Sequence, residues 1–423
     1  MEICMLKGGV NMIAPKLRFK ADDGSAFPDW EEKKINDIAT CFAGATPSTK
    51  IPEYWEDGTI QWMSSGEVNN GQIFETEKRI SKLGFDKCST KMVKPNTVVI
   101  ALAGQGKTRG MVAITRTSLC TNQSLCAIET NTDICDDYLY QYLQLQYNNL
   151  RLISSGDGTR GGLNLKLIGN YSVSIPSLSE QQKIADFLST IDTIIEKQRA
   201  TVSAWEERKK GVMQKLFSQE VRFKADDGSD FPDWEEKKLE EVSNKIKVGF
   251  VGTCDCFYVE KHGVKLYRTG NLIDGKLVDT DMKYVTRQFH EKNKKSQLKK
   301  WDILIARHGN SGHAVLYDSD EDANCLNIVI IQPNLDLVNP RFLTNNINSS
   351  VVEKQVYRLK GGSTQVVLNT TAIEKIKVSI PSLPEQQKIA DFLSALDTVI
   401  QKQKETLEKW QELKKGLLQQ MFV

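Results

Sequence analysis

Mostly apolar residues recur with alternating spacings of four and three along two long stretches of the chain. The first stretch has this spacing at Ile184, Leu188, Ile191, Ile195, Gln198, Val202, Trp205, Lys209, Val212 and Leu216. The second has it at Ile389, Leu393, Leu396, Ile400, Gln403, Leu407, Trp410, Lys414, Leu417 and Met421. Such spacing is typical of the a and d positions of a coiled coil. It predicts two helices of about 38 residues, each roughly 57 Å long.

A helix of this length with one apolar stripe needs a partner, and the two stretches suit each other. We predict an antiparallel pair whose seam contains Leu188, Ile191, Ile195, Gln198, Leu393, Leu396, Ile400 and Gln403. Antiparallel pairing would bring the two seam glutamines close together and fix the register. Ser177 with Glu180, and Ser382 with Glu385, predict a capping box at each helix start. The alternative is that each helix packs only on its own globular domain.

The chain consists of two copies of one plan. Leu17–Lys34 reads LRFKADDGSAFPDWEEKK, and Val221–Lys238 repeats it almost unchanged. Ser174–Ser189 and Ser379–Ser394 form a second near-identical pair, whereas the regions between, about 41–170 and 245–377, share little identity. This alternation predicts that constant segments dock one partner twice while variable regions read two different targets. The alternative is a recent duplication with uneven drift. With antiparallel helices, the chain's beginning would also lie beside its end.

Composition narrows the class of protein. The 423 residues are 40% hydrophobic and 26% charged, which fits two or three folded domains. A net charge of +2 excludes a histone-like polycation, so any nucleic-acid site must be a local patch. The nine cysteines have no framework spacing, and no apolar run is long enough for a secretory signal or a membrane span. We therefore expect a soluble cytoplasmic protein with reduced thiols and no membrane partner.

One loop imitates a nucleotide-binding motif. Ala101–Thr108 reads ALAGQGKT and follows a strand-like run, but the next residues, Arg109–Ile114, predict another strand instead of the helix that a phosphate loop must open. The second variable region offers a parallel, in which ILIAR, HGNSG and HAVLY follow one another. Both stretches therefore predict strand, glycine-rich loop, strand.

The sequence supplies no constellation typical of catalysis. Pro28-Asp29 with Glu31-Glu32-Lys33 imitates a nuclease motif, but these residues are too close in sequence to hold a metal from separate strands. Cys254, Cys256, His308 and His313 have weak spacing for zinc. An adenine-methyltransferase signature, Asn or Asp followed by Pro-Pro and an aromatic residue, does not occur. We expect neither a metal site nor enzymatic activity in this chain.

The FPDWEEKK openings, the IPSL-x-EQQKIADFLS helix starts, the two variable regions and the heptad helices resemble the specificity subunit of type I restriction–modification enzymes. The resemblance implies that each variable region is a target-recognition domain for one half of a bipartite, asymmetric site on double-stranded DNA. It also implies that the helices space these domains and dock two methyltransferase (modification) subunits, which restriction (motor-nuclease) subunits join. S-adenosylmethionine, ATP and Mg would then belong to those partners, and this chain would hold no cofactor.

The expected fold is α+β, with two globular mixed α/β target-recognition domains, two long antiparallel coiled-coil helices and an approximate two-fold. The expected divisions are an N-terminal extension (1–16), the first recognition domain (17–176), the first long helix (177–218), the second recognition domain (219–381) and the second long helix (382–423). The alternative function is a non-catalytic duplicated scaffold that binds other proteins through its coiled coil.

Glycine-rich polar turns in the variable regions can offer donors to a DNA groove. The expected DNA-binding residues of the first domain are Ser65, Asn69, Gln105, Lys107, Arg109 and Arg160. Those of the second domain are Arg268, Asn271, Lys295, Arg307, Asn310 and Gln365. The amides suit adenine edges, and arginine suits guanine or phosphate. Lys295 lies in a lysine-rich stretch, Lys292–Lys300, which we interpret as a phosphate-binding rail.

Overall fold

The computed structural model describes residues 15–104, 106–154, 162–273, 275–307, 313–359 and 370–422. The chain divides into two compact units, which we describe separately. Unit 1 comprises Met1–Arg199 with Glu405–Val423, and unit 2 comprises Ala200–Lys404. Each unit therefore contains one variable region together with part of both long helices.

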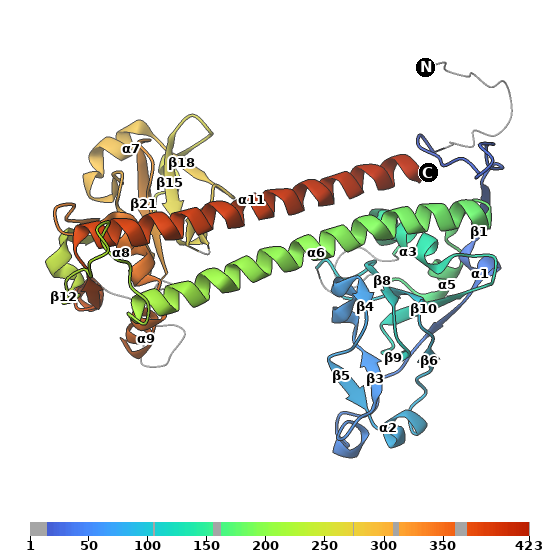
Figure 1. Ribbon diagram of the computed structural model, residues 1–423. Coiled ribbons are helices and arrows are strands. Elements are labelled where there is room, and N and C mark those ends of the chain that lie inside the picture. The colour runs from blue at the N-terminus through green and yellow to red at the C-terminus, as the bar shows by residue number, and fades with distance from the viewer. Residues whose placement is uncertain are drawn as a thin grey trace. The chain divides into compact units, whose positions relative to one another are not determined.

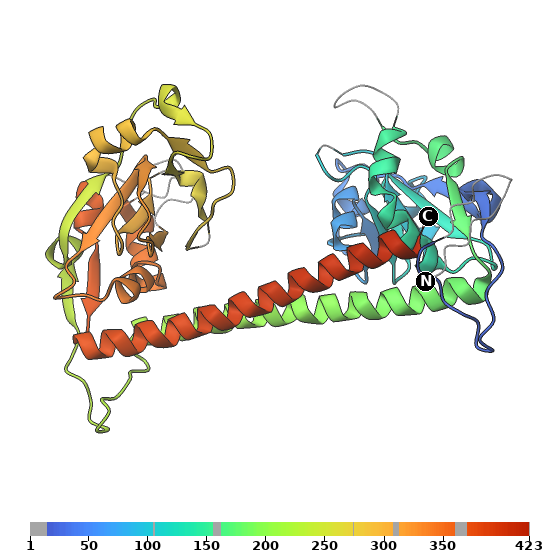
Figure 2. The same cartoon turned by 90° about the horizontal axis from the view of Figure 1, so that it is seen from above.

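The two long helices are α6 (Leu178–Phe217) and α11 (Leu383–Met421), of 40 and 39 residues. In unit 2, Lys209 Nζ lies 2.6 Å from Asp397 Oδ1, and Lys404 Nζ lies 2.6 Å from Glu206 Oε1. From the first ion pair to the second, the residue number rises on α11 from 397 to 404 and falls on α6 from 209 to 206, so the helices run antiparallel. In unit 1 the two helices also lie side by side, with Lys414 Nζ 2.6 Å from Asp192 Oδ1 (Figure 2). The predicted antiparallel pair is confirmed within each unit.

The predicted seam residues face inward. Leu188, Ile191, Ile195, Leu393 and Ile400 are buried. Leu396 is half-buried and packs against the core of unit 2. Gln198 and Gln403 are half-buried as well, but they belong to different units, and their meeting stays a prediction.

Unit 1 is built on two sheets that share a core. A five-stranded sheet has the order β2-β10-β7-β8-β4, a four-stranded sheet has the order β5-β3-β9-β6, and β1 pairs with β11 (Figure 1). The strands are β1 (Glu31–Lys34), β2 (Ala39–Ala43), β3 (Ile60–Met63), β4 (Gln72–Ile73), β5 (Lys78–Ile80), β6 (Met92–Val93), β7 (Val98–Ala101), β8 (Val112–Thr115), β9 (Leu119–Thr121), β10 (Leu125–Thr130) and β11 (Ser172–Ile175). The shorter helices are α1 (Ile35–Ile38), η1 (Pro52–Tyr54), η2 (Ser65–Asn70), α2 (Lys82–Asp86), α3 (Asp136–Leu145), α4 (Tyr147–Leu152) and α5 (Leu165–Gly169).

The uninterrupted apolar run of β7 follows from burial of both sheet faces. Val98 and Ile100 pack into a core with residues of α3 and α6. Val99 and Ala101 point to the other face and pack with Met63, Val68 and other residues of the four-stranded sheet and η2. A strand covered on both sides has apolar residues at every position instead of at alternate ones.

Unit 2 repeats this plan with a different sequence. Its sheets have the orders β13-β22-β19-β20 and β14-β18-β15-β21, with β12 paired to β23 and β16 to β17. The strands are β12 (Glu235–Lys238), β13 (Ser243–Val248), β14 (Tyr258–Val259), β15 (Val264–Arg268), β16 (Leu272–Ile273), β17 (Lys276–Leu277), β18 (Lys283–Val285), β19 (Ile303–Ala306), β20 (Ala314–Leu316), β21 (Ala323–Leu326), β22 (Ile328–Pro333) and β23 (Lys377–Ile380). The shorter helices are η4 (Leu239–Val242), η5 (Asp255–Phe257), η6 (Thr269–Asn271), α7 (Arg287–Lys292), η7 (Lys294–Ser296), α8 (Pro340–Ile347), α9 (Ser350–Leu359) and α10 (Thr370–Glu374).

The two variable regions therefore share a topology that their sequences conceal. Each has a parallel strand pair, β3–β9 or β15–β21, in which Trp62 lies opposite Cys120 and Tyr267 lies opposite Cys325. In each pair the first strand also pairs with an antiparallel strand, β5 or β18. Each also has a β-hairpin, β7–β8 in the five-stranded sheet of unit 1 or β19–β20 in the sheet of unit 2 that contains β13 and β22. The predicted α+β fold, with two mixed domains joined through long helices, is confirmed.

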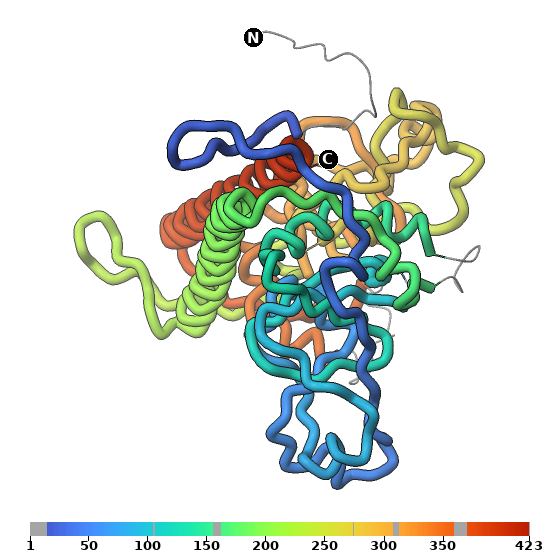
Figure 3. Tube along the Cα trace, turned by 90° about the vertical axis from the view of Figure 1, so that its right-hand side faces the viewer, coloured from blue at the N-terminus to red at the C-terminus, as the bar shows by residue number. Residues whose placement is uncertain are grey.

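The first described segment of the chain lies beside the end of α11, as predicted for the chain's beginning. In unit 1 the Leu17 N–H donates to the Gln420 carbonyl at 2.9 Å, and the segment before β1 runs alongside the last turns of α11 (Figure 3). Phe422 packs edge to face on Trp30, with ring centroids 6.5 Å apart. Within the described ranges, no helix is both long enough and apolar enough to span a bilayer.

The described cysteines are free thiols with contrasting environments. Cys256 is exposed, whereas burial raises the pKa of Cys120 to about 11 and raises that of the fully buried Cys325 further. At pH 8 a thiol of pKa 11 holds on the order of a hundred-fold less thiolate than an ordinary one. We therefore expect Cys256 to react with a disulfide reagent before Cys120 and Cys325, which should be modified only in denaturant. Peptide mass spectrometry after timed labelling checks this order, and early labelling of Cys325 would contradict it.

Candidate nucleic-acid interface

The loop that imitates a nucleotide-binding motif joins two antiparallel strands. β7 and β8 pair with Val98 opposite Ile114, so no helix follows the glycines, and the predicted strand–loop–strand arrangement is confirmed. Gly104, Gly106 and Gly110 have φ values of +141°, +71° and +83°. These values favour glycine, and they let the chain reverse within a short loop that exposes Lys107.

Two side chains of α4 hold this loop. Arg151 Nη1 donates to the carbonyls of Gly106 at 2.8 Å and Arg109 at 3.3 Å, and also to Tyr147 Oη at 3.0 Å. The Tyr147 hydroxyl donates to the Lys107 carbonyl at 2.7 Å. The guanidinium lies over the Tyr147 ring, 5.4 Å from its centroid. We call Tyr147 and Arg151 the α4 clamp; the sequence analysis missed it, because nothing local marks these residues.

Two other described segments of unit 1 lie beside this hairpin. The Leu163 N–H donates to the Leu102 carbonyl at 3.0 Å, so Leu163 lies beside the end of β7. Ser65 and Asn69 lie in η2, where Ser65 is half-buried and Asn69 exposed. The Ile114 N–H donates to the Gly71 carbonyl at 2.8 Å, which ties the end of η2 to β8. Gln105 and Arg160 lie outside the described residues.

In unit 2 the structure corrects the expectation for Asn271. Its side chain is 1% exposed, and its Oδ1 accepts from the Arg268 N–H at 2.9 Å. Its Nδ2 donates to the carbonyls of Val278 and Thr280, both at 3.0 Å. A buried amide whose donors and acceptor are used inside the fold has none left for an adenine edge. Asn271 holds a turn, and it is not a base-reading residue.

Arg268 is engaged as well. Its Nη2 donates to Asp281 Oδ2 at 2.8 Å, and this hydrogen bond lowers the pKa of Asp281. A DNA contact by Arg268 would have to replace that pair. Arg307 is half-buried directly after β19. Asn310 and Gln365 lie outside the described residues.

The lysine-rich stretch of unit 2 is exposed. Lys292, Lys294, Lys295 and Lys299 are exposed, and within the described ranges they form no ion pair. Lys300 instead lies 2.6 Å from Asp320 Oδ2. Four of the five lysines of the predicted rail can therefore meet a phosphate backbone without first giving up a carboxylate.

The constant segments bind each other. Arg18 Nε and Nη2 donate to the two carboxylate oxygens of Glu180 at 2.9 and 2.7 Å, which raises the pKa of Arg18. Trp30 Nε1 donates to Glu180 Oε2 at 3.1 Å, and Glu180 is 0% exposed. Among the described residues the Ser177 hydroxyl has no hydrogen-bond partner, so the predicted capping box is wrong. The Glu180 carboxylate binds the preceding constant segment instead of the helix start.

The second copy repeats this arrangement. Arg222 donates to both carboxylate oxygens of Glu385 at 3.1 and 2.8 Å, and Trp234 Nε1 donates to Glu385 Oε2 at 3.1 Å. The Ser382 hydroxyl likewise has no hydrogen-bond partner within the part of the chain that the structure describes, so its capping box is also wrong. The two constant segments of each copy must therefore stay matched to one another, whatever lies between them.

Comparison with known sequences decides the family. A profile of the type I restriction modification DNA specificity domain matches residues 28–202 and again residues 232–409. The chain belongs to this family. Its two matches coincide with the two copies of the repeat, so it is a specificity subunit with two target-recognition domains.

Two known specificity subunits are similar in sequence to this chain over nearly its whole length. The type I restriction enzyme MjaVIII specificity subunit of Methanocaldococcus jannaschii is 27% identical over 409 residues, which cover 92% of each chain. The MjaIX specificity subunit of the same organism is 25% identical over 404 residues, again 92% of each. The crystal structure of a type I S subunit from M. genitalium shares the fold with a TM-score of 0.59 at 17% identity, over 97% of this chain and 99% of that one.

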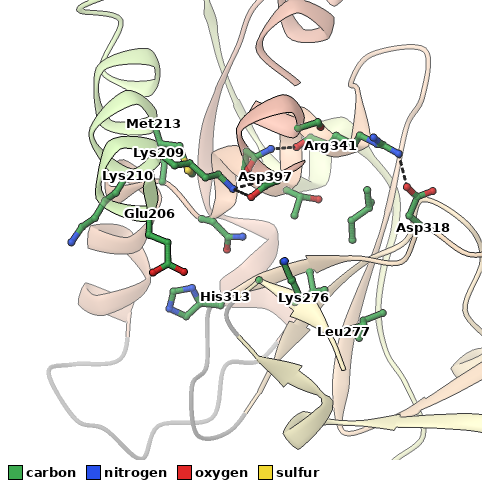
Figure 4. Close-up of a pocket in the computed structure, with 18 of the residues that line it drawn as sticks. Glu206, Lys209, Lys210, Met213, Lys276, Leu277, His313, Asp318, Arg341 and Asp397 are labelled. Carbon is green, nitrogen blue, oxygen red and sulfur yellow. Dashed lines mark hydrogen bonds and ion pairs between the residues drawn. The ribbon is translucent and has the colours of Figure 1, made fainter. Parts of the chain in front are cut away.

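The recognition domains of this specificity subunit differ in how they meet the long helices. Unit 2 has a cleft of about 1070 Å³ lined by Thr344, Asn345 and Asn348 of α8 and its C-terminus, and by residues of α6, α9 and α11. Figure 4 shows Lys209 directed at Asp397 on one side of it and Arg341 directed at Asp318 on the other.

Longer side chains occupy the matching positions in unit 1. Tyr138 packs on Trp30 as Phe342 packs on Trp234, so Tyr138 and Phe342 are equivalent. This match aligns Tyr140 with Thr344, Gln141 with Asn345 and Gln144 with Asn348. Gln141 Nε2 donates to Asp192 Oδ2 at 2.6 Å, and Lys414 Nζ donates to Gln144 Oε1 at 3.0 Å. In unit 1, therefore, Gln141 and Gln144 form hydrogen bonds with the long helices, whereas the matching residues of unit 2 line a cleft. The described part of the chain contains no cluster of three or more His, Cys, Asp or Glu able to hold a metal.

Proposed function

We propose that this specificity subunit reads a bipartite, asymmetric site on double-stranded DNA, with the variable region of each unit recognising one half. The observation that carries the proposal is the shared topology of two dissimilar sequences. Both regions contain a β-hairpin, β7–β8 or β19–β20, and in unit 1 η2 and Leu163 lie beside it. A common frame with different loop residues suits two readers that bind the same polymer but different bases.

The charges of the candidate loops support contact with the backbone of DNA. Lys107 in unit 1 and Lys295 in unit 2 are exposed, and both side chains are flexible donors suited to phosphate. We assign base reading in unit 1 to the loops that carry Ser65, Asn69, Lys107 and Arg109. In unit 2 we assign it to Arg307, Asn310 and Gln365, of which Asn310 and Gln365 lie outside the described residues.

We further propose that two methyltransferase subunits dock on the constant segments. Internal contacts account for the constancy of Arg18 and Glu180. Phe187 and Phe392 also pack edge to face on Phe19 and Phe223, but these contacts leave part of each phenylalanine exposed. Phe187 and Phe392 are 38% and 40% exposed, and Leu178 and Leu383 are 46% and 41% exposed. The same apolar side chains at the same helical positions offer one partner two equivalent surfaces.

On this proposal the chain supplies recognition and its partners supply chemistry. S-adenosylmethionine would bind the methyltransferase subunits, and ATP and Mg would serve restriction subunits that join the complex. The chain itself would have no catalytic activity and no cofactor.

Exchange of the first variable region tests the proposal. Replacing residues 41–170 with the variable region of another specificity subunit should change one half of the methylated sequence and leave the other half intact. Mapping of methylated adenines across a genome by single-molecule sequencing reads both halves at once. The matched control exchanges residues 245–377 and should change the opposite half. A motif that stays unchanged in both exchanges, or that changes throughout in either, would contradict the assignment.

A further inference from the structure

The α4 clamp fixes the backbone of the β7–β8 loop and leaves its side chains outside. Its hydrogen bonds to the described residues of the loop include those to three main-chain carbonyls, of Gly106, Lys107 and Arg109. The exposed Lys107 side chain forms no ion pair within the described ranges. The clamp therefore controls the path of the loop without occupying the Lys107 side chain.

The packing of the clamp depends on a glycine. A Cβ added at Gly110 would lie 3.2 Å from Arg151 Cγ and 3.5 Å from the Tyr147 carbonyl oxygen, so the α4 residues approach the bare backbone closely. Arg151 is half-buried, and its charged donor strengthens the hydrogen bonds to the carbonyls. The loop and α4 thus pack together in the folded protein. The conformational entropy of the loop is lost when the protein folds and not when it binds DNA.

Unit 2 fastens its hairpin with a different residue. Asn348, directly after α8, accepts from the Ala314 N–H at 2.7 Å and donates to the Ala314 carbonyl at 2.8 Å. Ala314 is the first residue of β20 and follows the hairpin loop. Each variable region thus has its own fastening between the helical layer and the hairpin.

We propose that the α4 clamp is a specificity-determining element of the first recognition domain, an inference that rests on the proposed function. Arg151 and Tyr147 are positioning residues. By holding three carbonyls of the loop, they set the one geometry in which Lys107 and its neighbours meet the first half-site. The sequence read by the domain then depends on α4 as well as on the residues that touch DNA.

The test compares Arg151→Ala with the wild type in the complete complex with methyltransferase subunits. The measurement is the rate of adenine methylation on the target site and on sites with one base changed in either half. We expect discrimination within the first half-site to fall roughly tenfold, about one good base contact, while discrimination within the second half-site is unchanged. Arg151→Lys keeps the charge but loses the fork of donors, and it should give an intermediate loss.

Two further variants separate positioning from folding. Asn148→Ala removes an exposed side chain of the same helix and should change neither half-site. Asn348→Ala should relax the second half-site and spare the first. If discrimination is unchanged in Arg151→Ala, or falls equally at both half-sites, the proposed role of the α4 clamp is wrong, whereas the proposed function still stands. A wild-type complex that methylates no bipartite sequence would overturn the proposed function and the clamp with it.

Discussion

Replacement of Arg18 by alanine is expected to destabilise the start of unit 1 by about 3 kcal/mol, because it leaves a buried charge without its partner. The Glu180 carboxylate is 0% exposed and takes two hydrogen bonds from Arg18 at 2.9 and 2.7 Å. Once Arg18 is gone, the Trp30 indole N–H, 3.1 Å from Glu180 Oε2, is the side-chain donor that remains to this carboxylate among the described residues. Hydrogen exchange followed by mass spectrometry should show faster exchange in peptides from residues 17–34 and 178–190.

The second copy provides an internal control for this experiment. Peptides from residues 221–238 and 383–394 contain the equivalent Arg222–Glu385 pair, and their exchange should not change in Arg18→Ala. Arg222→Ala should give the reverse pattern. The double variant Arg18→Ala/Glu180→Gln should recover part of the loss, since it removes the uncompensated charge. The explanation would be contradicted if the double variant exchanged faster than Arg18→Ala, or if Arg18→Ala destabilised both copies equally.

The features predictable from the sequence are those with a local period. The seam spacing identified both long helices, since a single apolar stripe of that length leaves few ways to be covered. Their antiparallel sense was expected because it would bring the two seam glutamines together. The hairpin over residues 98–115 was also predictable, because its apolar runs flank a loop too rich in glycine to be anything but a turn. These patterns reflect burial, which local sequence records well.

The errors share one cause, which is that a polar side chain chooses its partner in three dimensions. Ser177 and Glu180 have capping-box spacing, yet the carboxylate bonds Arg18, which lies 162 positions away. Asn271 sits in a polar turn with the composition of a reading loop, yet its amide ties that turn together. A sequence shows which donors and acceptors exist, but only the fold decides which of them are already taken.

The partners of the two seam lysines also depend on the three-dimensional fold. At Lys209 and Lys414 the heptad pattern predicts a position facing the partner helix, but it offers no reason for a charge there. The structure gives the reason: each lysine meets an aspartate of the partner helix that lies one position after a seam residue, Asp397 after Leu396 and Asp192 after Ile191. Predicting this pairing would have required the register in advance.

Reversal of the charge at Lys414 should strongly destabilise the helix pair of unit 1. The Lys414 and Asp192 side chains are only 13% and 15% exposed, and Lys414 Nζ lies 2.6 Å from Asp192 Oδ1. Lys414→Glu would set two carboxylates against each other in a site with little water, at a cost of about 4 kcal/mol. We expect the end of α11, residues 405–422, to lose protection from proteolysis and from hydrogen exchange.

Restoring the pair in the opposite sense tests whether charge is the cause. Asp192→Lys/Lys414→Glu should recover much of the lost stability if the contact is an ion pair, and the double-mutant cycle measures the coupling between the two residues. Recovery should be incomplete, because Gln141 Nε2 donates to Asp192 Oδ2 and Gln144 Oε1 accepts from Lys414, and both would face the wrong group. In unit 2, Lys209 also meets Asp397, but the side chains are 19% and 43% exposed, so the same reversal there should cost less. Equal costs in the two units would mean that burial of the pair does not set its strength.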